Sequence, residues 1–236
     1  MSAPTPLRRP VSYVIFDVDG VLLDTERFYT EVTQEIVGRY GKTFDWSVKG
    51  NMIGRKAIDA ARYLVEALDL PIAAEDYLRE REAGLKRLMP TADAMPGARA
   101  LTDALAARGI PMALATSSAR AFFELKATRH RAWFAATFRV VVAGDDPRLT
   151  HAKPAPDIFL LAARELGADP AGCLVVEDSP AGVEAARAAG MQVLAVPDPG
   201  MDRAPYAEAD LVVESLDGLD LALLHLTPPP SEGDRT

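Results

Sequence analysis

The sequence predicts an α/β fold with a doubly wound parallel sheet, and two of its features support this class. Short apolar runs, each long enough for a buried strand but too short for a helix, alternate with segments of helical pattern. Some helical segments start at a proline suited to the first turn and stop at a glycine, as residues 156–167 do. Strands that alternate with helices form a parallel, Rossmann-like sheet with helices on both faces.

Six short apolar runs are predicted to be strands. The first, Ser12 to Asp17, consists mainly of β-branched and aromatic residues, and the others are similar. In chain order the six runs are Ser12 to Asp17, Ile110 to Thr116, Phe138 to Gly144, Cys173 to Glu177, Gln192 to Pro197 and Asp210 to Val213. Helices are predicted between them at Ala98 to Ala107, Pro156 to Leu166 and Ser179 to Gly190. Right-handed crossovers bring the carboxyl ends of all these strands to one edge of the sheet.

One long segment after the first strand interrupts the alternation. It contains no convincing strand, only helical patterns around Arg27 to Tyr40, Arg55 to Leu68 and Ala74 to Leu88. The turn Met95-Pro96-Gly97 marks the return to the sheet. We therefore expect a small helical domain at residues 25–93, a core of residues 11–24 and 94–226, and disordered tails at residues 1–10 and 227–236.

The composition excludes several classes of protein. A hydrophobic fraction of 49% with 25% charged residues is too apolar for intrinsic disorder. The formal net charge of -8, without a basic patch, argues against nucleic acids and anionic lipids as partners. Cys173 is the only cysteine and is expected in a buried strand, and no apolar run suits a signal peptide or a membrane span. We expect a cytoplasmic protein, and a monomer.

Carboxylates and hydroxyls gather where the predicted strands end, which is where open parallel sheets bind ligands. The four groups are Asp17 with Asp19, Thr116-Ser117-Ser118, Asp145-Asp146 and Glu177-Asp178-Ser179. Converging carboxylates repel each other unless a cation neutralises them, and an all-oxygen site suits Mg²⁺. A single Asp or Ser can instead cap the helix that follows a strand, and this alternative stays open for Asp145, Asp146 and Ser179.

Four segments, in this order, resemble the motifs of the haloacid dehalogenase-like superfamily. They are DVDGVLLDTE from Asp17, ALATSS at the end of the second predicted strand, HAKPAPD around Lys153, and VVEDSPAGVEAA, which starts at Val175 within the fourth predicted strand. The helical insertion resembles the cap that some members of this superfamily carry after the first strand. The resemblance implies a phosphatase that uses Mg²⁺ and acts on a small phosphorylated metabolite.

The resemblance also implies catalytic roles. Asp17 would attack phosphorus and form a covalent aspartyl-phosphate. Asp19 would protonate the departing alcohol and then activate water. Thr116 and backbone N-H groups near Ser117 would bind phosphoryl oxygens, and Lys153 would place its ammonium against the nucleophile and the phosphate.

A metal site is implied by the same motifs. Asp178, one oxygen of Asp17 and the backbone carbonyl of Asp19 would hold Mg²⁺. Glu177 would tune this set of ligands, directly or through water.

Other chemistries occur in the superfamily and remain alternatives. Asp19 argues against a dehalogenase, which typically lacks an acid there. A phosphonate-cleaving enzyme needs a cap lysine, for which Lys42, Lys49 and Lys56 are candidates. Enzymes resembling β-phosphoglucomutase carry a cap histidine where this chain has Tyr29. A catalytically silent binding protein is the remaining alternative, although such proteins usually lose the nucleophile or the acid.

The substrate is indicated by a narrower resemblance. Segments such as TERFY, GIPMALATSS, GDDP and HAKPAPDIFL resemble the pseudouridine-5'-phosphatase branch of the superfamily. This implies pseudouridine 5'-phosphate or a similar nucleotide, with sugar phosphates as the alternative. Arg55 and Lys56, which follow Gly54, are the expected cap contacts to the substrate.

Overall fold

The chain folds into two compact units. The computed structural model describes residues 5–52 and 57–229. One unit, here the core unit, combines Met1–Asp24 with Asp93–Thr236, and the other, here the helical unit, is Thr25–Ala92.

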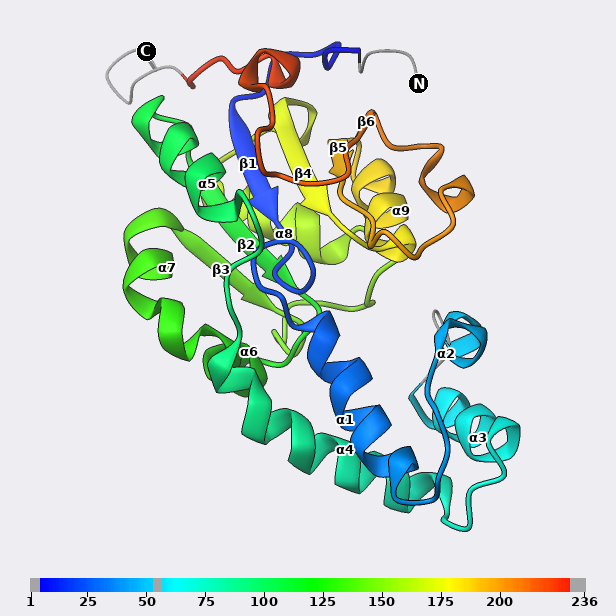
Figure 1. Ribbon diagram of the computed structural model, residues 1–236. Helices are drawn as coiled ribbons and strands as arrows, with labels where there is room; N and C mark the ends of the chain where they lie inside the picture. The colour runs from blue at the N-terminus through cyan, green and yellow to red at the C-terminus, as the bar shows by residue number, and fades with distance from the viewer. Residues whose placement is uncertain (1–4, 53–56, 230–236) are drawn as a thin grey trace. The chain divides into compact units, whose positions relative to one another are not determined.

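The core unit is built on a parallel sheet of six strands in the order β3-β2-β1-β4-β5-β6 (Figure 1). The strands are β1 Tyr13–Phe16, β2 Met112–Thr116, β3 Val140–Ala143, β4 Cys173–Glu177, β5 Gln192–Ala195 and β6 Leu211–Val212. Each lies within a predicted strand, and every pairing is parallel. The predicted fold class, a doubly wound parallel sheet, is confirmed.

Helices cover both faces of this sheet. Along β1, Ile15 joins an apolar cluster with Phe159 and Val183 on one face. Phe16 points to the other face, where its ring meets that of Phe138 edge to face at a centroid distance of 5.9 Å. This alternation is the two-residue period of a strand buried on both sides.

The described residues of the core unit form five α-helices, which lie between its strands in chain order. They are α5 Ala98–Ala107, α6 Arg120–Lys126, α7 Arg131–Thr137, α8 Asp157–Leu166 and α9 Pro180–Ala188. Short 3₁₀ turns lie at Ala127–His130, Pro170–Gly172, Ala204–Tyr206 and Leu221–Leu224. The sequence patterns had indicated α5, α8 and α9. They had not indicated α6 or α7, because seven residues are too few to show a helical period.

The helical unit contains α1 Glu26–Gly38, α2 Trp46–Met52, α3 Ala57–Ala67, α4 Ala74–Leu88 and the 3₁₀ turn Met89–Thr91. Its centre is α4, which packs against both α1 and α3. Tyr77 of α4 is fully buried and its hydroxyl shares a 2.8 Å hydrogen bond with Thr33 of α1. A Cβ at Gly84 would lie 2.6 Å from Val32 Cγ1, so a glycine is required where α4 crosses α1.

The start of the described chain differs from the prediction. Leu7 is buried, and its backbone N-H donates to the carbonyl of Leu223 at 2.8 Å. The backbone N-H of Arg9 donates to Gln192 Oε1 at 3.1 Å. The expected disorder over residues 1–10 is therefore wrong for residues 7–9, because one apolar side chain and these paired backbone groups tie the segment to the core unit.

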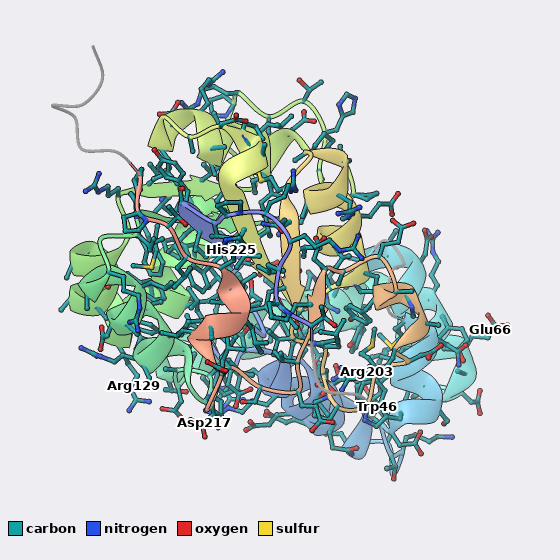
Figure 2. The ribbon with its side chains drawn as sticks, turned by 90° about the horizontal axis from the view of Figure 1, so that it is seen from above. Trp46, Glu66, Arg129, Arg203, Asp217 and His225 are labelled. Carbon is teal, nitrogen blue, oxygen red and sulfur yellow. The ribbon has the colours of Figure 1, made fainter. Side chains whose placement is uncertain are left out.

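Charged side chains such as Glu66, Arg129 and Asp217 are exposed (Figure 2). Across residues 5–52 and 57–229, no helix has both the length and the apolar character needed to cross a bilayer.

Candidate active site

The candidate site lies at the carboxyl ends of β1 and β4. The chain builds the sheet outward from β1 in one direction and from β4 in the other, so the strand order reverses between them. Open α/β sheets bind their ligands at such a point. Asp17 directly follows β1, its N-H donates to the carbonyl of Val176 at 3.0 Å, and Glu177 ends β4.

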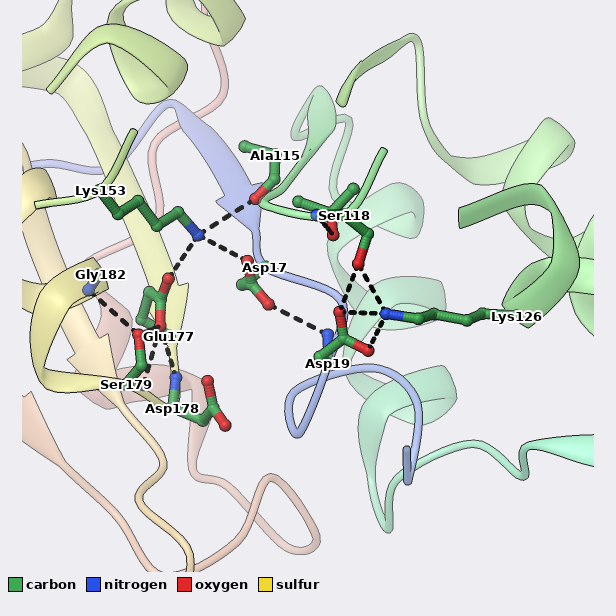
Figure 3. A network of polar contacts seen from close by, with 11 residues as sticks. Asp17, Asp19, Ala115, Ser118, Lys126, Lys153, Glu177, Asp178, Ser179 and Gly182 are labelled. Atoms are coloured by element: carbon green, nitrogen blue, oxygen red, sulfur yellow. Dashed lines mark hydrogen bonds and ion pairs between the residues drawn. The ribbon is translucent and has the colours of Figure 1, made fainter. Parts of the chain in front are cut away.

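Asp17 is buried, and each of its carboxylate oxygens accepts a hydrogen bond (Figure 3). Lys153 Nζ donates to Oδ1 at 2.6 Å, and the backbone N-H of Asp19 donates to Oδ2 at 3.0 Å. Burial raises the pKa of Asp17 to about 7, although the adjacent Lys153 ammonium opposes this rise. The nearby carboxylates of Glu177 and Asp19 raise it further. The Asp17 carboxyl is fixed in direction, and an additional cation would favour its charged form.

Lys153 lies in the loop between β3 and α8 and joins two strand ends. Its Nζ donates to Asp17 Oδ1 and Glu177 Oε1, both at 2.6 Å, and lies 3.3 Å from the carbonyl oxygen of Ala115. Burial lowers the pKa of Lys153, but the charges of Asp17 and Glu177 outweigh it and raise that pKa above its usual value. Asp157 secures the loop by accepting the backbone N-H groups of residues 150 and 151.

Glu177 is held by donors of the protein on both oxygens. Oε1 accepts from Lys153, while Oε2 accepts from the backbone N-H groups of Asp178 and Ser179, each at 2.9 Å, and from the Ser179 hydroxyl at 3.0 Å. A Cβ at Gly182 would overlap the Glu177 carboxyl group. The glycine therefore lets this carboxylate lie against the first turn of α9.

Asp19 makes an ion pair that the sequence analysis missed. Lys126, at the end of α6, donates from Nζ to both carboxylate oxygens of Asp19, at 2.6 and 2.7 Å. The same Nζ lies 2.6 Å from Ser118 Oγ, which in turn lies 3.3 Å from Asp19 Oδ2. The Lys126 side chain is only 1% exposed. No sequence pattern marked it, because a lone lysine in a short helix is ordinarily a surface residue.

The Asp178 carboxylate lies against the turn that follows Asp19. Gly20 in this turn has φ +68, and a Cβ there would overlap Asp178 Oδ2. The described residues hold no cluster of three His, Cys, Asp or Glu side chains arranged as metal ligands. Two carboxylates, a backbone carbonyl and water molecules are nevertheless a donor set that Mg²⁺ accepts. Asp17, Asp178 and the carbonyl of Asp19 fit such a set.

The predicted phosphate-binding residues end β2. Thr116 is fully buried, and its Oγ1 accepts the backbone N-H of Ser118 at 3.2 Å. Ser117 is exposed. A Cβ at Gly144, after β3, would overlap the carbonyl of Ser117, so the β2 and β3 ends approach closely.

Three polar residues at the same edge bond to local groups of the protein, but only Ser179 caps the helix that follows its own strand, which was the alternative left open for all three. Asp145 Oδ1 accepts the backbone N-H of Arg120, the first residue of α6, at 2.8 Å. Asp146 pairs with the Arg148 guanidinium, whose hydrogen bonds hold the pKa of Asp146 at about 2. Ser179 caps α9 by accepting the N-H of Gly182 at 3.1 Å.

The helical unit contains a cavity of about 380 Å³. Its lining combines polar and aromatic side chains, among them Glu26, Tyr29, Thr30, Lys49 and Arg81. Lys49 Nζ donates to Thr30 Oγ1 at 3.1 Å, and the Arg81 guanidinium lies 5.9 Å from the centre of the Tyr29 ring. The predicted substrate contacts at positions 55 and 56 lie outside the described residues.

Comparison with known proteins identifies the family. A family model described as "Hydrolase: haloacid dehalogenase-like hydrolase" matches residues 11–190. The chain belongs to this family. The resemblance inferred from the four sequence motifs is confirmed.

Relatives of this haloacid dehalogenase-like hydrolase carry phosphatase names. The chain is 49% identical to "(DL)-glycerol-3-phosphatase 1, mitochondrial" of Arabidopsis thaliana, over 89% of this chain and 72% of the relative. It is 44% identical to "Probable pseudouridine-5'-phosphatase" of Drosophila melanogaster, over 88% of this chain and 91% of the relative. A crystal structure of a HAD family hydrolase from Deinococcus radiodurans R1 with bound phosphate and sodium superposes with a TM-score of 0.77 at 28% identity, covering 94% of this chain and all of the other. The prediction of a phosphatase enzyme is confirmed.

Proposed function

We propose that this enzyme hydrolyses a small phosphate monoester through an aspartyl-phosphate on Asp17, with Mg²⁺ as cofactor. The observation that carries the proposal is the fixed position of the buried Asp17 carboxylate, which accepts hydrogen bonds from Lys153 Nζ and from the backbone N-H of Asp19. A carboxylate held in one direction is prepared for in-line attack on phosphorus.

The first step transfers the phosphoryl group to the enzyme. One Asp17 oxygen forms a bond to phosphorus while the ester oxygen leaves, and Asp19 gives that oxygen its proton. Thr116 and backbone N-H groups near Ser117 bind the phosphoryl oxygens in this proposal, and Lys153 offsets their charge. In the second step water attacks phosphorus, Asp19 takes its proton, and orthophosphate leaves while the Asp17 carboxylate is regenerated.

Mg²⁺, held by Asp17, Asp178 and the carbonyl of Asp19, would neutralise charge around the phosphoryl group. We assign Glu177 a different role from direct ligation, because its Oε2 accepts three hydrogen bonds and its Oε1 pairs with the Lys153 ammonium, whereas each Asp17 oxygen accepts one hydrogen bond. Its carboxylate holds Lys153 in place and keeps the ammonium charged. Asp17 and Lys153 thereby stay at a fixed separation.

We further propose that the helical unit acts as a cap that recognises the alcohol part of the substrate. Its cavity of about 380 Å³ is in the range of small-molecule sites, and its cations and hydroxyls suit a polar ligand. A closing cap would also exclude bulk water from the phosphoryl group. We expect the enzyme to be cytoplasmic and monomeric, which cell fractionation and size-exclusion chromatography would test.

Two substrates are proposed. Glycerol 3-phosphate comes first, because the relative that is 49% identical is named for it. Pseudouridine 5'-phosphate comes second, supported by the 44% identical relative and by the sequence segments that resemble its branch.

The experiment is a comparison of kcat/KM for phosphate release from glycerol 3-phosphate, pseudouridine 5'-phosphate and uridine 5'-phosphate. A pocket that recognises the base should prefer pseudouridine 5'-phosphate to uridine 5'-phosphate by at least about tenfold, since its C-glycosidic base exposes an extra ring N-H. Equal kcat/KM values for the two nucleotides, together with a higher value for glycerol 3-phosphate, would support glycerol 3-phosphate as the substrate. Release from none of these and from no other phosphate monoester would contradict the proposed function.

A further inference from the structure

We propose that Lys126 is a positioning residue for Asp19 and sets the direction of its carboxylate from within the core unit. This inference rests on the proposed function, in which Asp19 is the acid and base. It assigns a role to a buried lysine that takes no other part in that function.

The contacts form a closed group of three side chains (Figure 3). Lys126 Nζ lies 2.6 and 2.7 Å from the two Asp19 oxygens and 2.6 Å from Ser118 Oγ. An ammonium has three N-H donors, which matches these three acceptor atoms. Ser118 Oγ lies 3.3 Å from Asp19 Oδ2 and closes the group.

Burial makes this arrangement specific. The Lys126 side chain is 1% exposed, whereas Asp19 is 23% exposed. A buried ammonium without a partner is strongly unfavourable, so Lys126 is constrained to stay with the carboxylate. Its charge also lies over the Phe122 ring, 4.9 Å from the ring centre.

The helix that carries Lys126 is itself anchored to the sheet. The backbone N-H of Arg120, at the start of α6, donates to Asp145 Oδ1 at 2.8 Å, and the Arg120 guanidinium donates to the carbonyl of Val141 in β3 at 2.7 Å. The lysine therefore reaches Asp19 from a helix whose other end is fixed at the neighbouring strand. All of these contacts lie inside the core unit.

A fixed Asp19 matters because its proton must reach the ester oxygen at the moment that bond breaks. A misplacement of about 1 Å can cost a reaction on the order of a hundredfold. Lys126 and Ser118 belong to the same core unit as Asp19. Lys153 and Glu177 perform the corresponding task for Asp17, so the two catalytic carboxylates are held by different lysines and can be perturbed separately.

The test uses two phosphate monoesters that differ in their need for an acid. The oxygen of 4-nitrophenyl phosphate leaves without much protonation, whereas that of glycerol 3-phosphate needs it. The ratio of the two kcat/KM values reports on the step that forms the phosphoenzyme. Lys126→Met keeps the length of the side chain and removes its donors. We expect kcat/KM to fall about a hundredfold for glycerol 3-phosphate and at most about tenfold for the aryl ester, within the range of positioned proton transfer.

A double-mutant comparison separates positioning from a merely structural role. In the Asp19→Asn background, adding Lys126→Met should change kcat/KM by less than about threefold, because the group that Lys126 positions is already lost. Lys126→Arg, which keeps a cation able to pair with both carboxylate oxygens, should recover part of the activity. Thr102→Val is the structural control: it removes the 3.0 Å hydrogen bond from Trp133 Nε1 in the same unit. It should lower Tm without altering the ratio between the two esters.

Two results would overturn the inference. One is an equal fall in kcat/KM for both esters in Lys126→Met. The other is a fall caused by Lys126→Met that is as large in the Asp19→Asn background as in the wild type. If circular dichroism shows that Lys126→Met does not fold, Lys126→Gln and Ser118→Ala carry the same test, and the absence of the leaving-group effect in both would overturn it equally. An active wild type that is inactivated by Asp17→Asn shows that the proposed function stands even if Lys126 fails this test. A wild type that releases no phosphate from either ester, nor from any other phosphate monoester, refutes the proposed function itself.

Discussion

The carboxyl group of Asp178 occupies the space into which a Cβ at Gly20 would point, with its Cγ only 2.8 Å from that position. This close approach brings the end of β4 onto the turn that follows Asp19. We therefore expect Gly20→Ala to displace Asp178 and reduce kcat by at least about a hundredfold. Steady-state phosphate release measures the effect.

Gly109→Ala is the matched control for Gly20→Ala. Gly109 has nearly the same backbone angle, φ +71 against +68, but nothing lies within 4 Å of its would-be Cβ. Both variants bear the strain of a left-handed non-glycine residue, about 1 kcal/mol, and only Gly20→Ala bears the clash. Similar activity in the two variants would contradict a role for the Asp178 position.

Removal of the metal should silence the enzyme. We expect EDTA to abolish phosphate release and Mg²⁺ to restore it. Binding should also raise Tm without substrate, since a ligand at a hundred times its Kd adds about 2.7 kcal/mol to the free energy of unfolding.

The rise in Tm on Mg²⁺ binding tests which carboxylates hold the cation. It should disappear in Asp178→Asn and persist in Asp145→Asn, because Asp145 accepts the Arg120 N-H at the same edge and an amide oxygen can do so too. A shift that survives Asp178→Asn would place the cation elsewhere.

The presence of Tyr29 leads us to expect hydrolysis of a sugar phosphate rather than its isomerisation. It lines the cavity of the helical unit beside Arg81, at the position where enzymes resembling β-phosphoglucomutase carry a histidine. We expect β-glucose 1-phosphate, supplied with a bisphosphate primer, to yield orthophosphate. Accumulation of glucose 6-phosphate, followed in a coupled assay, would show mutase activity instead.

Because the Cys173 thiol is buried, we expect the folded chain to lose stability at alkaline pH. Burial, with a smaller effect of Asp169, raises the pKa of this thiol from 9.0 to about 12 in the folded chain. The unfolded thiol ionises near pH 9 while the folded one keeps its proton. The contribution of the buried thiol is therefore complete below pH 9 and is lost as pH rises toward 12.

Urea unfolding of the wild type and of Cys173→Ala measures this contribution. Between pH 9 and pH 10 the wild type should lose up to about 1.4 kcal/mol more than the variant, because other groups titrate equally in both. Parallel curves would mean that the thiol ionises as easily in the folded state.

The positions of the strand-end residues followed from the sequence because they depend on strong, local signals. Six apolar runs predicted the strands, and the rule for parallel sheets then selected the edge where Asp17, Lys153 and Glu177 meet. The four motifs added their proposed roles.

Other features depend on contacts between distant parts of the chain, which no local pattern records. Lys126 and Asp19 are 107 positions apart and meet only because α6 returns to the end of β1. Leu7 is similarly ordered by Leu223. Whether Ser179 binds a ligand or caps α9 was likewise undecided until its hydrogen bond to Gly182 was seen.

The most direct test of the proposed mechanism is acid quenching during turnover, followed by peptide mass spectrometry. With 4-nitrophenyl phosphate, whose oxygen leaves without much protonation, we expect one phosphoryl group on the peptide that contains Asp17. This phosphopeptide should be more abundant in Asp19→Asn, because water is then activated poorly. The label should be absent from Asp17→Asn, whose activity should fall below about a hundredth of the wild type. Phosphate release with no phosphorylated Asp17 peptide in either active form, or with the phosphoryl group on another residue, would contradict it.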